Sequence, residues 1–358
     1  MRNPLSDKIT TIKPSGIRKF FDLVSEMKDA ISLGVGEPDF DTPWRIREEG
    51  IYTLEKGKTY YTSNSGLMDL RIEISRYLER RFGLNYDAEK EIIVTVGGSE
   101  GIDLAFRAML NPGDEVIIPE PCYVSYVPCV TLADGVPVTV NLKEENDFKL
   151  TKEQLLSAIT PRTKILVLAF PNNPTGAVMT KEELEEIAEV VKEKDIFVVS
   201  DEIYAELSYG NTRHCSIASI DGMKERTIVI NGFSKAHAMT GWRLGYACGP
   251  EVIIKQMLKI HQFAIMCAPT NSQYAAVEAL RECDDAVEEM RNEYDRRRRF
   301  MLSKLRGMGL KVFEPYGAFY IFPNIAEFGL TSDEFATRFL TEEKVAVAPG
   351  NYGLDFTR

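Results

Sequence analysis

Lys235 and Arg243 lie in one segment that follows a short apolar run, residues 227–230. This run is rich in β-branched residues and is followed by Asn-Gly, which predicts a buried strand. A lysine on the loop that leaves a buried strand is costly unless its amine has a partner or a covalent role. One such covalent role is an imine with a carbonyl cofactor. A surface loop that holds a lysine and an arginine by chance is the alternative.

A glycine-rich turn follows another apolar run, residues 92–96, and opens a helical pattern. Its sequence is Gly97-Gly98-Ser99-Glu100-Gly101. Backbone N–H groups at the start of a helix are free and lie at the positive end of the helix dipole, so this turn could bind a phosphate. Gly-Gly-Ser is also a common helix entrance, and a plain helix start remains the alternative.

Three more functional groups follow predicted strands. Tyr123 comes after residues 115–118, where its ring could stack on a flat heterocycle or simply pack. Asn173 lies in Pro-Asn-Asn-Pro after residues 164–169, a turn rigid enough to fix its amide. Asp201 ends a third run, where it could hold a protonated pyridine nitrogen or cap a helix.

Tyr204, three residues after Asp201, adds a phenol. Together these segments place an aromatic ring, an amide, an acid, this phenol, a lysine and an arginine beside a possible phosphate site. In a parallel sheet the carboxyl ends of the strands meet at one edge, where ligands bind. The combination fits a cofactor with a pyridine ring, a phosphate, a phenolic oxygen and an aldehyde. That cofactor is pyridoxal phosphate.

The pattern of apolar runs predicts an α/β fold with a mostly parallel sheet and helices on both faces. The predicted strands are residues 92–96, 115–118, 136–140, 164–169, 196–200, 227–230 and 244–248. After Pro250 long helical segments lead to an α+β unit. Its predicted elements are strands at residues 311–313, 318–322 and 345–347 and a helix at residues 332–340. We expect a large domain, residues 45–260, and a smaller unit formed by residues 1–44 and 261–358.

Composition excludes several classes of protein. With 358 residues, 44% hydrophobic and 27% charged, the chain is typical of soluble globular proteins and long enough for two structural units. A net charge of −11 argues against nucleic acid as a partner. The six cysteines form no CxxC pair, which favours free thiols in a reducing cytoplasm. The three histidines lack ligand spacing, and no run of about 18 apolar residues exists, so we expect neither a metal site nor a membrane span.

The sequence resembles the class I and II aminotransferases, a large family of pyridoxal-phosphate enzymes with fold type I. The resemblance extends from residues 33–40 to the C-terminus and is most specific at residues 171–176, 201–204 and 234–243. It implies a seven-stranded sheet in a large domain and a smaller α+β domain. It also implies amino-group transfer from an L-amino acid to a 2-oxo acid in two half-reactions. A pyridoxal-phosphate C–S lyase on the same fold, or a cofactor-binding regulatory module, is the alternative.

The resemblance implies roles for the matching residues. Lys235 would form the Schiff base and move the proton, Asp201 would pair with the pyridine nitrogen, and Tyr204 with Asn173 would bond the phenolic oxygen. Tyr123 would stack on the ring. The phosphate site would comprise Gly98, Ser99, Glu100, Ser234, Arg243 and, from the neighbouring subunit, Tyr61.

Substrate binding is implied in the same way. The substrate carboxylate would lie beside Gly36 and Asn173 and be clamped by Arg358. If Tyr61 reaches the phosphate of the neighbouring subunit, the functional unit is a homodimer with composite active sites. Residues 351–358 form a shorter stretch than the family has at this point, so we expect the smaller domain to be incomplete at its C-terminal end. Aspartate, aromatic amino acids and diaminopimelate-type compounds are all candidate substrates.

Overall fold

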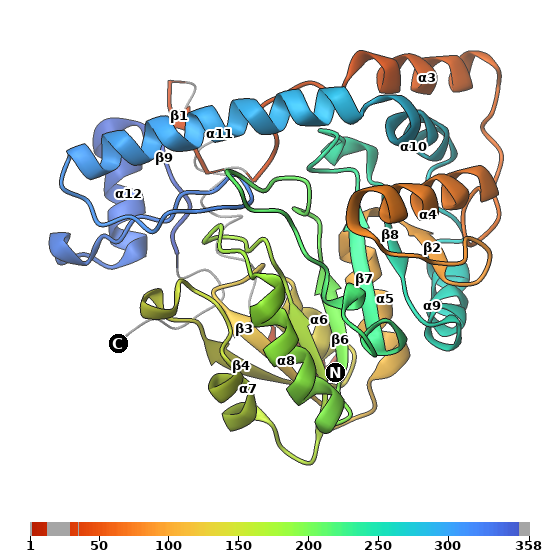
Figure 1. Cartoon of the computed structure of the whole chain (residues 1–358), viewed down its shortest axis with the longest axis horizontal. Coiled ribbons are helices and arrows are strands. Elements are labelled where there is room, and N and C mark those ends of the chain that lie inside the picture. The colour runs from red at the N-terminus through yellow and green to blue at the C-terminus, as the bar shows by residue number, and fades with distance from the viewer. Residues whose placement is uncertain (1, 13–28, 35, 351–358) are drawn as a thin grey trace.

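A seven-stranded sheet forms the centre of the protein in a computed structural model that describes residues 2–12, 29–34 and 36–350 (Figure 1). Across the sheet, the strands are β2 (Ile92–Thr95), β8 (Gly245–Cys248), β7 (Thr227–Gly232), β6 (Phe197–Asp201), β5 (Thr163–Leu168), β3 (Glu115–Glu120) and β4 (Val136–Asn141). Of these, β8 runs antiparallel to both of its neighbours, and the other pairings are parallel. The mostly parallel sheet and all seven predicted strands are therefore confirmed.

Helices cover both faces of this sheet, which explains why its strands read as continuous apolar runs. One face packs on α5 (Gly97–Met109), α6 (Tyr126–Leu132) and α9 (Glu251–Ala264). The opposite face packs on α4 (Met68–Phe82), α7 (Lys152–Ala158), α8 (Lys181–Glu193) and α10 (Thr270–Glu282). Within β5, Ile165 and Val167 belong to the first core, whereas Leu166 and Leu168 belong to the second. Alternate side chains are thus buried on opposite faces.

Several helices begin where the sequence supplies a complete cap. In α7, α8 and α12 (Ser332–Glu343), a threonine at the N-cap accepts from a backbone N–H, and a Gln or Glu three residues later returns the bond. This reciprocal capping satisfies two N–H groups that a helix start would otherwise leave free. These local signals fix where the helices start.

In the C-terminal part of the chain, the observed helices and strands differ more from the predicted ones. The long helix α11 (Asp284–Gly307) runs across the molecule toward α12 (Figure 1). The predicted strand at residues 345–347 is present as β9 (Val345–Ala346), and it pairs in parallel with β1 (Ile31–Ser32). The N-terminal segment that contains β1 therefore pairs with the C-terminal part of the chain.

The predicted strands at residues 311–313 and 318–322 are wrong, because an isolated bridge between Val312 and Pro323 takes the place of a ladder. Pro323, opposite Val312, has no backbone N–H to extend the pairing, and Ala318 has a φ of 55°, which no strand residue adopts. The division into residues 45–260 and a smaller unit stays a prediction.

The remaining described helices are α1 (Asp7–Thr11) and α3 (Trp44–Glu55). The helix α3 packs on α10 at the upper right of Figure 1. None of the helices in the described part of the chain combines the length and apolar character that a membrane crossing requires.

The close approach of β8 to the start of α5 yields a stability prediction. A methyl group on Gly245 would lie 2.6 Å from two backbone atoms, the carbonyl carbon of Gly97 and the nitrogen of Gly98. Backbone atoms cannot yield as a flexible side chain does, so we expect Gly245→Ala to lower the free energy of unfolding by roughly 1–3 kcal/mol. Urea denaturation measures this loss.

Gly241→Ala is the matched control, because a methyl group there has no atom within 4 Å. We expect its effect to stay within about 0.5 kcal/mol. Equal stability of the two variants would contradict the tight packing of β8 on α5.

Candidate active site

The predicted site residues meet at one edge of the sheet. The parallel strands β3, β5, β6 and β7 lead at their carboxyl ends to Tyr123, Asn173, Asp201 and Lys235, respectively. Since β8 is antiparallel, its first residue lies at this same edge, where Gly245 pairs with Gly232 of β7. Arg243, two residues earlier, is thereby brought to the edge as well. The antiparallel direction of β8 thus brings Arg243 to the edge where the other candidate site residues lie.

Lys235 is half-buried at this edge of the sheet. Its Nζ donates to the carbonyl oxygen of Gly36 at 2.5 Å and lies 5.7 Å from the ring centre of Tyr204 and 5.5 Å from that of Phe319. Burial lowers the pKa of Lys235 to about 8, against the opposing charges of Glu37 and Asp201. An amine with this pKa is partly neutral near neutral pH and can act as a nucleophile.

Asp201, the last residue of β6, is 8% exposed. The Tyr126 hydroxyl donates to its Oδ2 at 2.7 Å, and the Ile203 N–H donates to its Oδ1 at 3.2 Å. Burial nevertheless raises the pKa of Asp201 above its ordinary value. A cationic partner such as a protonated ring nitrogen would favour the ionised carboxylate.

Tyr204 is joined to a second phenol, Tyr320, by a hydrogen bond of 2.6 Å between their hydroxyl oxygens. Burial raises the pKa of Tyr320 to about 12, and that of Tyr204 lies well above its usual range for the same reason. Both hydroxyls therefore keep their protons at neutral pH. Tyr320 also reaches Gly36, since a methyl group there would lie 2.7 Å from the Tyr320 hydroxyl oxygen. A side chain larger than hydrogen does not fit between them.

The start of α5 forms the predicted phosphate site. Gly98, Ser99 and Glu100 lie in its first turn, where backbone N–H groups have no partner within the helix. Arg243 packs against this turn, because a methyl group on Gly97 would lie 2.8 Å from one of its guanidinium nitrogens. A bond to the carbonyl oxygen of Thr240 at 3.1 Å holds the guanidinium.

Three other features in or near this turn favour the binding of an anion. Among the described residues, no carboxylate forms a salt bridge with Arg243, so its charge is available to an anion. The Ser99 hydroxyl lies 3.4 Å from the hydroxyl of Tyr123. Ser234 is buried in the loop after β7.

The two adjacent asparagines after β5 have different surroundings. Asn172 is buried, and its amide bonds to the Pro121 carbonyl at 3.2 Å and to the Thr175 hydroxyl at 2.8 Å. Asn172 therefore holds the turn together. The amide of Asn173 is half-buried and has no hydrogen-bond partner in the described part of the chain, which leaves it available to a ligand.

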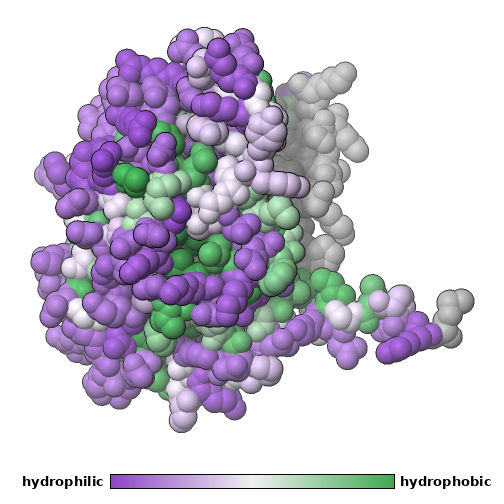
Figure 2. Space-filling view, turned by 90° about the vertical axis from the view of Figure 1, so that its right-hand side faces the viewer, coloured by the Kyte–Doolittle hydropathy of each residue, from purple (hydrophilic) through white to green (hydrophobic). Residues whose placement is uncertain are grey.

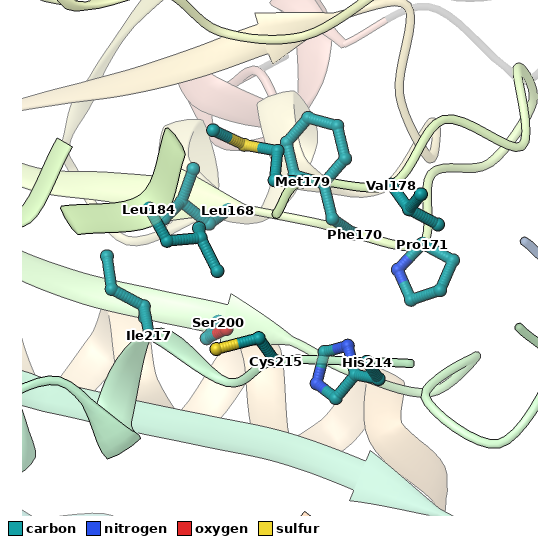
Figure 3. A pocket seen from close by; sticks show the side chains of 10 residues that line it. All are labelled: Leu168, Phe170, Pro171, Val178, Met179, Leu184, Ser200, His214, Cys215 and Ile217. Carbon is teal, nitrogen blue, oxygen red and sulfur yellow. The ribbon is translucent and has the colours of Figure 1, made fainter. Parts of the chain in front are cut away.

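A small cavity lies elsewhere, between β5 and the loop after β6 (Figure 3). Its volume is about 10 Å³, which is room for little more than one water molecule. Its lining residues are Leu168, Phe170, Pro171, Val178, Met179, Leu184, Ser200, His214, Cys215 and Ile217. Neither Lys235 nor Asp201 borders it, so this cavity is not the candidate site.

The residues beside this cavity stabilise the end of β6. Buried Glu202 accepts from Ser200 at 2.8 Å and from Ser216 at 2.6 Å, and its other oxygen bonds His214 at 2.9 Å. These bonds fix the strand end that presents Asp201 toward the opposite side.

Two predicted residues are not brought to this site within the described chain. The Tyr61 side chain is 79% exposed and makes no contact with Lys235, Arg243 or the start of α5. Arg358 lies outside the described residues. In addition, the described residues contain no cluster of three or more His, Cys, Asp or Glu side chains that could hold a metal ion.

Tyr126 and Tyr320 were not predicted as site residues. Tyr126 lies only three positions after Tyr123, a nearness in sequence that could have indicated it, and the rings of the two residues are 5.7 Å apart. Tyr320 carries no such signal, because it reaches Tyr204 only through the tertiary fold.

The arrangement fits pyridoxal phosphate. A half-buried amine of lowered pKa, a buried carboxylate, the Asn173 amide, and a helix start beside the Arg243 guanidinium suit the aldehyde, ring nitrogen, phenolic oxygen and phosphate, respectively. Fold and site together define a fold-type I enzyme of this cofactor class.

Comparison with known proteins identifies the family. The family described as "Aminotransferase class I and II" matches residues 28–354. The chain is 49% identical to an aspartate aminotransferase of Pyrococcus abyssi, over 97% of this chain and 90% of the relative. It is 46% identical to aromatic-amino-acid aminotransferase 2 of Thermococcus litoralis, with the same two coverages of 97% and 90%.

The structure agrees with that relationship. Aspartate aminotransferase from Thermus thermophilus, solved with maleate, superposes with a TM-score of 0.93 at 41% identity, covering 98% of this chain and 92% of that one. The chain belongs to the class I and II aminotransferases. It is a pyridoxal-phosphate-dependent aminotransferase.

The burial of Lys235 yields a prediction about its reactivity. Because an ordinary lysine titrates near pH 10.4, its labelling by acetic anhydride rises mainly above pH 9. We expect labelling of Lys235 in the cofactor-free protein to follow an apparent pKa of about 8. Mass spectrometry after competitive labelling at a series of pH values measures this titration. A Lys235 curve that coincides with those of exposed lysines would contradict the burial of its amine.

Proposed function

We propose that this aminotransferase moves an amino group from an L-amino acid to a 2-oxo acid in two half-reactions, with Lys235 as the central residue. The observation that carries this proposal is the half-buried Lys235, whose amine of lowered pKa is held at the carboxyl edge of the sheet near Asp201. When bound, pyridoxal phosphate supplies an aldehyde carbon that takes up the amine and a ring that accepts electrons from the substrate Cα.

Lys235 performs two tasks in this proposal. Its Nζ would bond the aldehyde carbon of the cofactor, and its amine would carry the proton away from the substrate Cα and back. The lowered pKa of about 8 suits both tasks, because the amine can lose and regain its proton near neutral pH. The carbonyl of Gly36 holds the same amine in the free chain.

In this proposal the surrounding residues bind and orient the cofactor and the substrate. Asp201 holds the proton on the ring nitrogen, and Tyr204 and Asn173 donate to the phenolic oxygen, with Tyr123 against the ring. The phosphate is bound by Arg243, Ser234 and the N–H groups of Gly98, Ser99 and Glu100. Since Tyr126 already supplies one bond to Asp201 and Tyr320 one to Tyr204, both groups are oriented before a ligand binds. Gly36, Asn173 and Arg358 bind the substrate carboxylate.

The first test is turnover with a panel of donors. We expect activity with aspartate, an aromatic amino acid or a diaminopimelate-type donor and 2-oxoglutarate as acceptor, because relatives are named for these three substrate classes. Lys235→Ala should lower kcat by at least about 1,000-fold, since it removes both the covalent anchor and the proton carrier.

Lys255→Ala is the control, because Lys255 is an exposed residue of α9 that forms a salt bridge with Glu251 in the same helix. Its kcat should equal that of the wild type. Wild-type kcat in Lys235→Ala, or formation of pyruvate and ammonia from a cysteine-like substrate in place of a new amino acid, would refute the proposal.

We further propose that the working unit is a homodimer whose active sites take Tyr61 from the partner. Large apolar side chains are exposed on two adjoining segments, at Tyr60 (80%), Tyr61 (79%), Phe263 (86%), Ile265 (45%) and Met266 (43%). A bond of 2.8 Å from Asn64 to the Met266 carbonyl joins these segments. Hydrophobic side chains gather on the side of the molecule that carries α4, α9 and α10 (Figure 2). A patch of this kind is typical of a subunit interface.

Mixing two inactive variants tests the composite site. Lys235→Ala lacks the amine, and Tyr61→Ala lacks the phenol. If Tyr61 acts across the interface, a mixed dimer contains one site with an intact Lys235 and an intact Tyr61. We therefore expect activity to appear when the two purified variants exchange subunits, up to about one quarter of the wild-type value for random exchange.

Each variant incubated alone is the control for this experiment. Activity no greater than the average of the two separate variants would show that Tyr61 serves its own subunit or none.

The location of the protein is also a proposal. All six cysteines are free thiols, which supports the reducing cytoplasm.

A further inference from the structure

We propose that Glu100 and His261 form a positioning pair that sets the affinity of the phosphate site, although neither side chain touches the phosphate. The inference rests on the proposed function, in which the start of α5 binds the phosphate. Two observations carry it: both carboxylate oxygens of Glu100 are occupied by protein donors, and one of those donors is a fully buried histidine from another helix.

The first bond closes the corner between β2 and α5. The Glu100 Oε2 accepts from the backbone N–H of Val96 at 2.5 Å. Val96 is the N-cap of α5, and its apolar side chain cannot supply the usual capping bond. Glu100, in the first turn, therefore reaches back and satisfies an N–H group that would otherwise be free. The Thr95 hydroxyl adds a bond to the Gly97 carbonyl at 2.8 Å, which tightens the same corner.

The second bond ties this corner to α9. The Nδ1 of His261 lies 2.7 Å from Glu100 Oε1, and the His261 side chain is fully buried. Its Nε2 has no hydrogen-bond partner within the described residues. The bond to Glu100 is thus the polar contact that fixes this ring. Because α5 packs on α9, the imidazole can hold the carboxylate from outside the phosphate site.

The bonds of Glu100 also bear on the electrostatic repulsion between its carboxylate and a bound phosphate. A carboxylate in the first turn of a helix that binds a phosphate would repel the phosphate. With one oxygen on Val96 and the other on His261, both carboxylate oxygens of Glu100 are held by donors of the protein. These two bonds keep the carboxylate in a fixed position while the N–H groups of the turn remain available to the phosphate. Loss of either bond would let the first turn shift or the carboxylate swing toward the phosphate.

Ligand binding to the cofactor-free protein tests this inference without turnover. Calorimetry with inorganic phosphate, pyridoxal phosphate and pyridoxal separates the phosphate contribution from that of the ring. We expect His261→Phe to weaken both phosphate-bearing ligands by roughly tenfold, as is typical when a residue behind a binding group is lost. Pyridoxal, which lacks the phosphate, should bind within about twofold of the wild type.

Conservative variants distinguish positioning from general packing. His261→Asn keeps a donor near Nδ1 and should restore phosphate affinity to within about threefold. Glu100→Gln keeps an acceptor for the Val96 N–H and removes the negative charge, so it should bind phosphate at least as tightly as the wild type. If His261→Phe does not fold, Glu100→Ala replaces it in the same comparison, with Glu100→Gln as its conservative partner.

Two outcomes would overturn the inference. One is unchanged phosphate affinity in His261→Phe and Glu100→Ala. The other is an equal loss for pyridoxal and pyridoxal phosphate, which would indicate a structural effect alone. Arg243→Gln separates this result from a failure of the proposed function. If Arg243→Gln leaves phosphate affinity unchanged, the phosphate site itself is misplaced, whereas loss in Arg243→Gln but not in His261→Phe refutes only the positioning pair.

Discussion

An amine that leaves water loses its hydration, and a protein interior must offset that loss with a partner or lower the pKa of the amine. Lys235 shows both responses, because its Nζ donates to the Gly36 carbonyl and burial lowers its pKa to about 8. The carboxylate of Asp201 stands in the same low-dielectric region, and burial shifts its pKa in the opposite sense. A lysine and an acid held in this state are costly in a cofactor-free chain, and a ligand that bonds both of them offsets the cost.

The sheet brings these groups together through strand direction. Parallel strands present their carboxyl ends at one edge, and the antiparallel β8 contributes its beginning there. Arg243 reaches the start of α5 for this reason, and Gly245 lets the two backbones come close enough for the guanidinium to lie over the first turn. The phosphate site therefore depends on a backbone contact as much as on any charged side chain.

The sequence predicted the sheet well because its strands are buried on both faces and read as unbroken apolar runs between turn residues. The predicted ends of those strands identified Asp201, Asn173 and Lys235 for the same reason. The small C-terminal unit was predicted less well. Residues 311–323 form one isolated bridge, and Ala318 has a positive φ of 55°, a backbone conformation that β-propensity alone does not reveal.

The hydrogen-bond partners of the site residues could not be predicted from the sequence. Tyr320 lies 116 positions from Tyr204, and His261 lies 161 positions from Glu100. Their hydrogen bonds exist only because separate elements pack together, and one sequence contains no pattern for such pairs. The residues that we propose to touch a ligand could thus be predicted from motifs, whereas the residues that orient them could not.

The central claim is that the cofactor is bonded to the Nζ of Lys235. Reduction of the cofactor-loaded protein with borohydride, followed by digestion and mass spectrometry, tests it most directly. We expect a single stable pyridoxyl group on the peptide that contains Lys235. A pyridoxyl group on another lysine, or no modified peptide from protein that is active in transamination, would contradict it.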